Sequence, residues 1–262
     1  MIDGWKIPGL KAGAKYVLRV IAVVTLLWFS CAGPGLAQKY SFRPVDLNDS
    51  VYRVSGKKLI LPATLIGFGF AQFSVPSLTD LNLAVRSGVH GLTNKPFRID
   101  NFSLYAPAVA VYGLNLFGVK GKHDFWDRSV ILATSLAVMG ASVEGIKLLT
   151  HIQRPDGTTF NSFPSGHTAT AFACAEFLYQ EYKDVSVWYG IAGYTIAAGT
   201  GFLRMYNNRH WFTDVVAGAG FGILSTRLAY WAFPKVSRLV YKTLKLKVSI
   251  VPQPIPLYGQ IR

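Results

Sequence analysis

Eight residues of types that bind anions and transfer protons occur in three short clusters between positions 147 and 214 of the chain. The clusters follow the patterns Lys-x6-Arg-Pro, Pro-Ser-Gly-His and Arg-x5-His-x3-Asp, and they supply three cations, two imidazoles and one carboxylate. Placing such groups in or beside apolar sequence is costly unless an anion or partner compensates them. The set therefore predicts a site that holds a tetrahedral dianion and breaks an ester bond to it. Its members are Lys147, Arg154, Ser165, Gly166, His167, Arg204, His210 and Asp214.

The first cluster lies at the end of a predicted helix. The six residues between Lys147 and Arg154 make about two helical turns, so both side chains would share a face if the helix continued. Pro155 should stop the helix, because the residue before a proline is disfavoured in the α conformation. Arg154 at this exit could grip two phosphate oxygens. Taken alone, the pair equally fits two cations that anchor a helix end at an interface.

The second cluster precedes an apolar helix predicted to start near Thr168. Backbone N–H groups at a helix N-terminus form a natural anion site, and Gly166 would let the backbone approach the ligand closely. Ser165 adds a hydroxyl donor, and His167 could give a proton to a leaving alkoxide. A simple helix cap is the competing interpretation.

The third cluster pairs a histidine with an aspartate four residues later, which places them on one face of a helix. Asp214 could accept a hydrogen bond from one ring nitrogen of His210 and leave the other free to attack phosphorus. Arg204 adds a third cation across the polar turn 206–209. In isolation such a pair can also be purely structural.

The elements that must position these clusters are apolar. Hydrophobic residues make up 51% of the 262 residues and charged residues 15%, below the usual share in soluble domains. The net charge of +14 does not indicate a nucleic-acid binder, because the basic residues crowd the two ends beside apolar runs. The two cysteines give no disulfide framework, and Cys174 fits a packing role in an apolar helix.

Apolar runs predict an all-α helical bundle with about five to six membrane helices, and a soluble all-α bundle is the alternative. The runs cover residues 59–75, 103–119, 129–150, 168–182, 185–203 and 213–233. Their recurrent glycines suit close helix packing in lipid. Glu176 lies inside one run, where an ionisable group is either functional or solvated near the helix end. His123 has no partner at a useful spacing and is expected to be a loop residue.

We expect four segments along the chain. Residues 1–37 form a signal peptide or an N-terminal anchor, 38–58 a polar segment, 59–234 the helical domain and 235–262 a basic tail. A basic tail should be cytoplasmic, which places all three clusters on the outer side of the membrane. If successive membrane helices alternate in direction back to the N-terminus, the result conflicts with a cleaved signal peptide. One apolar segment is therefore expected not to span the membrane, and residues 59–75 are the strongest candidate.

The three clusters, in this order and each at a junction between an apolar run and a loop, resemble those of the type 2 phosphatidic acid phosphatase (PAP2) superfamily. The resemblance covers roughly residues 140–220. It implies that His210 is a nucleophile forming a phosphohistidine, that Asp214 orients it, and that His167 is the general acid. It implies no metal and no cofactor. The remaining residues would bind the phosphoryl oxygens: Lys147, Arg154, Ser165, Gly166 and Arg204.

Leu203 departs from the pattern, because the family usually has serine before the arginine of the third cluster. The resemblance implies a lipid phosphatase or pyrophosphatase of the inner membrane with its site facing the periplasm or exterior. Its partner would be a lipid phosphate: lipid A, undecaprenyl pyrophosphate, phosphatidylglycerol phosphate or phosphatidate. The alternatives are a soluble periplasmic acid phosphatase, a vanadium haloperoxidase, and an anion-binding membrane transporter without chemistry.

Overall fold

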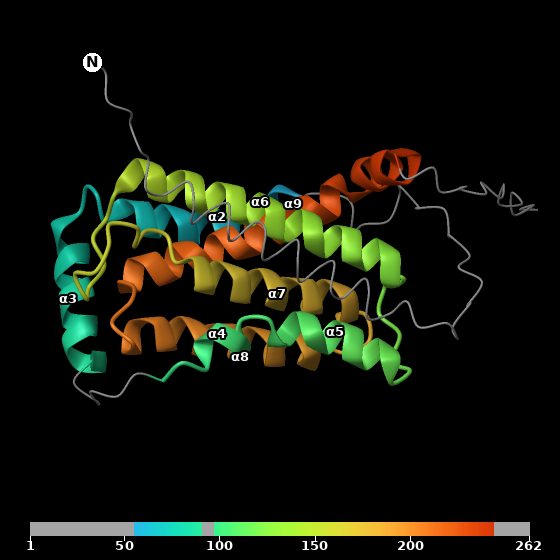
Figure 1. Cartoon of the computed structure of the whole chain (residues 1–262), viewed down its shortest axis with the longest axis horizontal. Helices are drawn as coiled ribbons and strands as arrows, with labels where there is room; N and C mark the ends of the chain where they lie inside the picture. The colour runs from blue at the N-terminus through green and yellow to red at the C-terminus, as the bar shows by residue number, and fades with distance from the viewer. Residues whose placement is uncertain (1–54, 91–96, 244–262) are drawn as a thin grey trace, which may run out of the picture.

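The computed structural model describes residues 55–90 and 97–243, and within them the chain forms eight helices and no strand (Figure 1). This confirms the predicted all-α fold class. The expected segments 1–37 and most of 38–58, and the end of the basic tail, lie outside the described residues. The helices are α2 (Gly56–Ala71), α3 (Pro76–His90), α4 (Asp100–Ser103), α5 (Ala106–Leu116), α6 (Phe125–Thr150), α7 (Gly166–Tyr182), α8 (Val187–Tyr206) and α9 (Phe212–Thr243).

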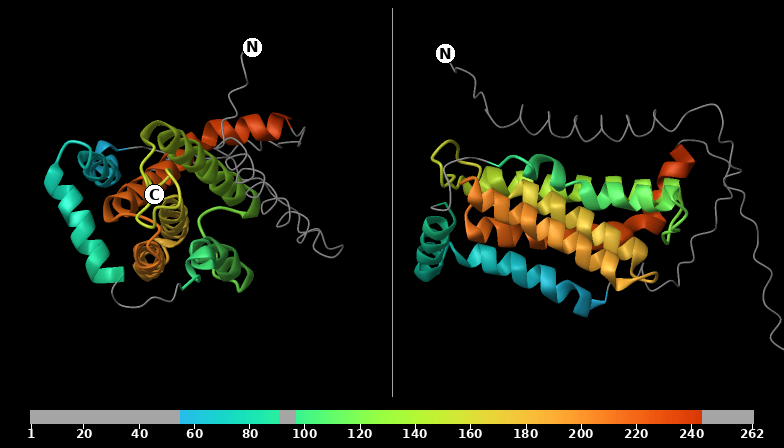
Figure 2. Two further views of the ribbon diagram at one scale, coloured as in Figure 1. Left: turned by 60° about the vertical axis from the view of Figure 1, so that its left-hand side comes forward. Right: turned by 90° about the horizontal axis from the view of Figure 1, so that it is seen from below.

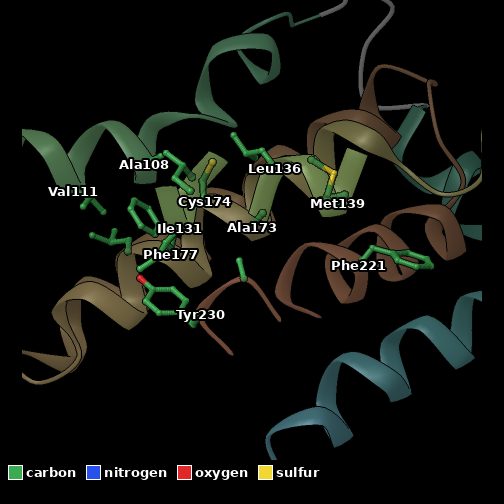
Figure 3. Close-up of a cluster of buried hydrophobic side chains, with 14 of the residues drawn as sticks. Ala108, Val111, Ile131, Leu136, Met139, Ala173, Cys174, Phe177, Phe221 and Tyr230 are labelled. Atoms are coloured by element: carbon green, nitrogen blue, oxygen red, sulfur yellow. The ribbon is translucent and has the colours of Figure 1, made fainter. Parts of the chain in front are cut away.

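Helix α7 is the centre of the bundle and packs against α5, α6, α8 and α9. It is buried along nearly its whole length, which its small residues allow. Large side chains from the surrounding helices fill the space beside it (Figure 3). This core holds the ends of four helices in a fixed relation, and so fixes any site built from those ends. Representative core residues are Val111, Ile131, Met139, Phe177 and Tyr230.

Glycine on α9 permits its close approach to α7. A Cβ added at Gly222 would lie 2.2 Å from the carbonyl oxygen of Ala169, and one at Gly218 would lie 2.6 Å from that of Ser165. Neither distance is tolerable for a real side chain. The two backbones therefore meet where the start of α7 lies against the second and third turns of α9.

Helices α2 and α3 form an elbow. They are bent by 94° at a short break, and α3 lies across one end of the bundle (Figures 1 and 2). Among the described residues, α6 is the one helix long and apolar enough to cross a bilayer unaided; the elbow is a second candidate if its two helices count as one span. The expected five to six membrane helices are therefore not confirmed.

Two other boundaries differ from the apolar runs. The run 103–119 is divided, because α4 ends at Ser103 and α5 covers only Ala106–Leu116. Helix α9 continues through Pro234 to Thr243, past the predicted domain end at 234. Apolar content alone gave neither boundary, since polar residues of 235–243 continue the same helix.

Two buried carboxylates make polar contacts away from the clusters. Glu176 of α7 is fully buried and accepts from Nε of Arg227 on α9 at 2.9 Å, so its role is a paired interhelical contact. His123 is also buried, and its Nδ1 lies 2.6 Å from Oε1 of Glu181. His123 lies in the loop before α6, as expected, but the expectation that it has no partner was wrong, because its partner Glu181 is 58 positions away in sequence.

Candidate active site

The three clusters meet at one end of the bundle. The end of α6, the start of α7, the end of α8 and the start of α9 lie together there, at the left in Figure 1. The charges of Arg204, Arg154, Lys147 and His167 all act on His210. Residues spread over 68 positions of sequence thus form one constellation.

Lys147 and Arg154 reach the site in different ways. Helix α6 ends at Thr150, and His151 has a left-handed backbone (φ 46°). The helix therefore stops before Pro155, and the two cations do not share a continuous helical face. The ammonium of Lys147 pairs with Glu144 at 2.9 Å and lies 3.3 Å from where a Cβ of Gly166 would be.

Arg154 lies in the loop between α6 and α7, where its Nε donates to Oδ1 of Asn161 at 2.9 Å. Burial lowers the pKa of its guanidinium, and the charges of Arg204 and Arg209 act in the same direction. Arginine nevertheless remains charged at neutral pH. Several like charges held this closely create a strong field for an anion.

Ser165 is the N-cap of α7. It is fully buried, and its hydroxyl accepts from the backbone N–H of Thr168. Its own backbone N–H donates to the carbonyl of Asp214 at 3.0 Å. The anion-binding N–H groups expected at this helix start are therefore those of Gly166 and His167, which an α-helix leaves without intrahelical partners.

His167 is half-buried, and its Nε2 donates to Oδ1 of Asn101 at 3.0 Å. This hydrogen bond places the ring proton on Nε2 in the neutral tautomer. Asn101 belongs to α4, and nothing in the sequence linked it to a residue 66 positions away.

Arg204 forms a buried ion pair with Asp100 of α4, with Nη1 and Oδ2 2.5 Å apart. Its Nε is buried and has no hydrogen-bond partner. Asp100 was not predicted either. Its carboxylate orients the guanidinium through Nη1 and leaves other donors of the group, Nε among them, for a ligand.

His210 lies in the loop before α9, with Nδ1 3.6 Å from Oδ2 of Asp214. This distance is too long for a hydrogen bond, and Nδ1 is buried without a partner. Oδ2 accepts instead from the hydroxyl of Ser162 at 2.5 Å and from the backbone N–H of Trp211 at 2.9 Å. The two residues face each other as predicted, although His210 is outside the helix.

The protonation state of His210 follows from its surroundings. Burial lowers its pKa well below the ordinary 6.5, and the charges of Arg204, Arg154 and Lys147 lower it further. At neutral pH the imidazole is therefore uncharged. A neutral ring with one nitrogen facing a carboxylate has its other nitrogen available as a nucleophile.

Comparison with known proteins assigns this region to a family. Residues 128–238 match the model of the PAP2 superfamily, and that part of the chain belongs to the superfamily. The match contains all three clusters. It excludes the helices from α2 to α5. One of these, α4, carries Asp100 and Asn101.

Two curated proteins resemble the chain in sequence. A lipid A 1-phosphatase of Porphyromonas gingivalis is 45% identical over 146 residues, which cover 55% of this chain and 32% of that protein. The bacitracin transport permease protein BcrC of Bacillus licheniformis is 30% identical over 96 residues, covering 37% and 45%. The chain thus aligns with less than half the length of either relative.

Two solved structures are also similar. LpxE of Aquifex aeolicus has 21% identity and a TM-score of 0.45, with 57% of this chain and 94% of that one covered. A transmembrane PAP2 type phosphatidylglycerolphosphate phosphatase of Bacillus subtilis has 20% identity and a TM-score of 0.49, with 70% and 96% covered.

Proposed function

We propose that the protein is a phosphatase that removes phosphate from a membrane lipid phosphate through a phosphohistidine intermediate. One observation carries the proposal: a buried, uncharged His210 faces Asp214 and is surrounded by the three cations and His167. A binding protein needs the cations, but it does not need a neutral imidazole held against a carboxylate.

The reaction has two balanced steps. Nε2 of His210 attacks phosphorus and the bond from phosphorus to the ester oxygen breaks. His167, protonated on both ring nitrogens when the phosphate dianion is bound beside it, gives one proton to the leaving alkoxide and becomes neutral. Water then attacks the phosphohistidine, His167 takes a proton from that water, and the bond between phosphorus and nitrogen breaks to release phosphate. Lys147, Arg154 and Arg204 stabilise the charge on the equatorial oxygens.

The substrate we favour is lipid A carrying a 1-phosphate. The support is the relative of that name, with 45% identity across 146 residues. Undecaprenyl pyrophosphate, phosphatidylglycerol phosphate and phosphatidate are the other lipids to compare. The basic residues that follow 234 favour a cytoplasmic C-terminus, and hence a catalytic end at the outer face of the inner membrane.

Phosphate release in detergent tests the proposal. Wild-type protein in EDTA should release phosphate from one lipid of this panel, with lipid A 1-phosphate the expected best. The His210→Ala protein should release at least about a thousandfold less, because the nucleophile is gone. His151→Asn is a matched control, since His151 is exposed and asparagine tolerates its left-handed backbone.

Three outcomes would contradict the proposal. Equal release by wild type and His210→Ala would mean another nucleophile. Loss of activity in EDTA with recovery on adding magnesium or zinc would mean a metal-dependent reaction. Phosphate binding without release from any lipid of the panel, by folded protein, would favour an anion-binding transporter.

A further inference from the structure

A small polar cluster joins the α2–α3 elbow to the start of α9. Nδ2 of Asn82 donates to the hydroxyl of Thr213 at 2.9 Å, and the backbone N–H of Thr213 donates to Oδ1 of Asn82 at 3.1 Å. The Thr213 hydroxyl is also 2.8 Å from Oε1 of Gln72. Thr213 and Asp214 are fully buried and Asn82 nearly so. The elbow therefore contacts the residue immediately before the carboxylate that faces His210.

Two buried atoms next to this cluster lack hydrogen-bond partners. One is Nε2 of Gln72, a donor, and the other is Oδ1 of Asp214, an acceptor. The Gln72 side chain also lies close enough to Asp214 to act on its carboxyl group. A buried donor and a buried acceptor without partners are each costly. Because they are complementary and adjacent, a small side-chain rotation would satisfy both.

We propose that Gln72 is a positioning residue of the active site, whose amide Nε2 donates to Oδ1 of Asp214. This inference rests on the proposed function. With Oδ1 held by Gln72, the ionised form of the carboxyl group is favoured and its Oδ2 stays turned towards Nδ1 of His210. Gln72 touches neither the substrate nor the nucleophile, and it lies outside the residues that match the family.

The two polar atoms of the Gln72 side chain have different roles. Oε1 of Gln72 accepts from Thr213, which is a structural contact, whereas Nε2 is the donor to Asp214. Gln72→Glu keeps an acceptor for Thr213 but replaces the donor with an oxygen. Gln72→Met keeps the length and removes both functions. The two variants therefore distinguish positioning of Asp214 from simple packing of the elbow.

The pH dependence of kcat is the decisive measurement. The titratable group facing Asp214 is the neutral His210, and the charge acting on it is that of Arg154; α3 carries Arg86, which donates to Asn208. We expect Gln72→Met to lower kcat about tenfold or more at every pH, with KM within about twofold of wild type. Gln72→Glu should be equally impaired at pH 8. It should recover most of its activity near pH 5, where the introduced carboxyl is protonated and again donates.

Thr213→Val is the matched control, because it removes the hydroxyl that Oε1 of Gln72 accepts from and leaves the donor in place. We expect it to lower the unfolding temperature without changing the shape of the pH profile. Recovery of Gln72→Glu at low pH, absent from Thr213→Val, supports the proposal. Parallel pH profiles for Gln72→Glu and wild type, with losses matched by lower unfolding temperatures, would show that Gln72 only packs the elbow. Absence of phosphate release by wild type would instead reject the proposed function.

Discussion

His210 combines burial with positive neighbours, and both keep its ring uncharged. A lowered pKa means that the imidazole becomes protonated, and loses its nucleophilic lone pair, only at a pH well below 6.5. We therefore expect kcat/KM to stay level as the pH falls from 8 through 6.5 and to decline only in more acid solution. Steady-state rates between about pH 4 and 9 measure this.

Arg154→Gln provides the internal comparison for that profile. It removes one of the charges that lower the pKa of His210, so the acid limb should move to higher pH even though the rate falls. A wild-type acid limb at or above pH 6.5, or no displacement in Arg154→Gln, would contradict the electrostatic explanation.

His167 should matter most when the leaving group needs a proton. Its Nε2–H donates to Asn101 in the ligand-free site. In the proposed reaction the ring is protonated on both nitrogens beside the bound phosphate, and this imidazolium gives a proton to the alkoxide. We predict that His167→Gln lowers the rate with a lipid alkyl phosphate by about 10²- to 10⁴-fold. With p-nitrophenyl phosphate, whose phenolate leaves without a proton, the loss should be under about tenfold. Similar losses with both substrates would mean that His167 only binds phosphate.

For individual residues, the sequence predicted which side chains of the site bear charge, and it predicted that His210 and Asp214 face each other. It did not predict Asp100 or Asn101, because they contact Arg204 and His167 across 104 and 66 positions. Ser165 was predicted to donate to phosphate; the structure shows its hydroxyl as the acceptor that caps α7, and its role as a donor stays a prediction.

At the scale of helices, the contact of α7 with α9 depends on glycine. A Cβ at Gly222 would lie 2.2 Å from the Ala169 oxygen and 2.8 Å from the Ala173 nitrogen, so backbone must move. We predict that Gly222→Ala destabilises the protein by about 3 kcal/mol and lowers activity, because α9 carries Asp214. Thermal unfolding in detergent measures the stability.

Gly199 of α8 supplies the control for this substitution. No atom lies within 4 Å of a Cβ added there. Alanine should therefore stabilise the helix slightly, by about 0.5–1 kcal/mol, through its better helix propensity. Equal unfolding temperatures for Gly222→Ala and Gly199→Ala would show that the close approach is not a constraint.

Apolar runs predicted helices α6 to α9 well, because each run is long and bounded by polar loops. They did not predict α3 (Pro76–His90), which lies outside every run, or the 94° bend between α2 and α3. They also failed for α5, where 17 uncharged residues form a helix of 11. Apolar content reports burial, whereas these breaks depend on contacts with other helices.

For the whole molecule, the orientation in the membrane can be tested at the two ends of the bundle. Thr158 lies in the exposed loop at the active-site end, and Asp184 lies in the exposed turn between α7 and α8 at the opposite end. In a Cys31→Ser background, Thr158→Cys should react with an impermeant thiol reagent from the periplasmic side. Asp184→Cys should react only after the inner membrane is opened. Cys174 is buried and should stay unlabelled. The reverse pattern would place the site in the cytoplasm.

The contact between Gln72 and Thr213 joins positions 141 residues apart, and this separation bears on how the protein is made. Synthesis starts at the N-terminus, so the elbow leaves the ribosome long before α9 exists. Contacts between distant positions form late, because a long loop must close first. A growing chain can therefore have every earlier helix in place and still lack a supported nucleophile. Until α9 has joined the bundle, the growing chain lacks both Asp214 and the contact that the elbow makes beside it.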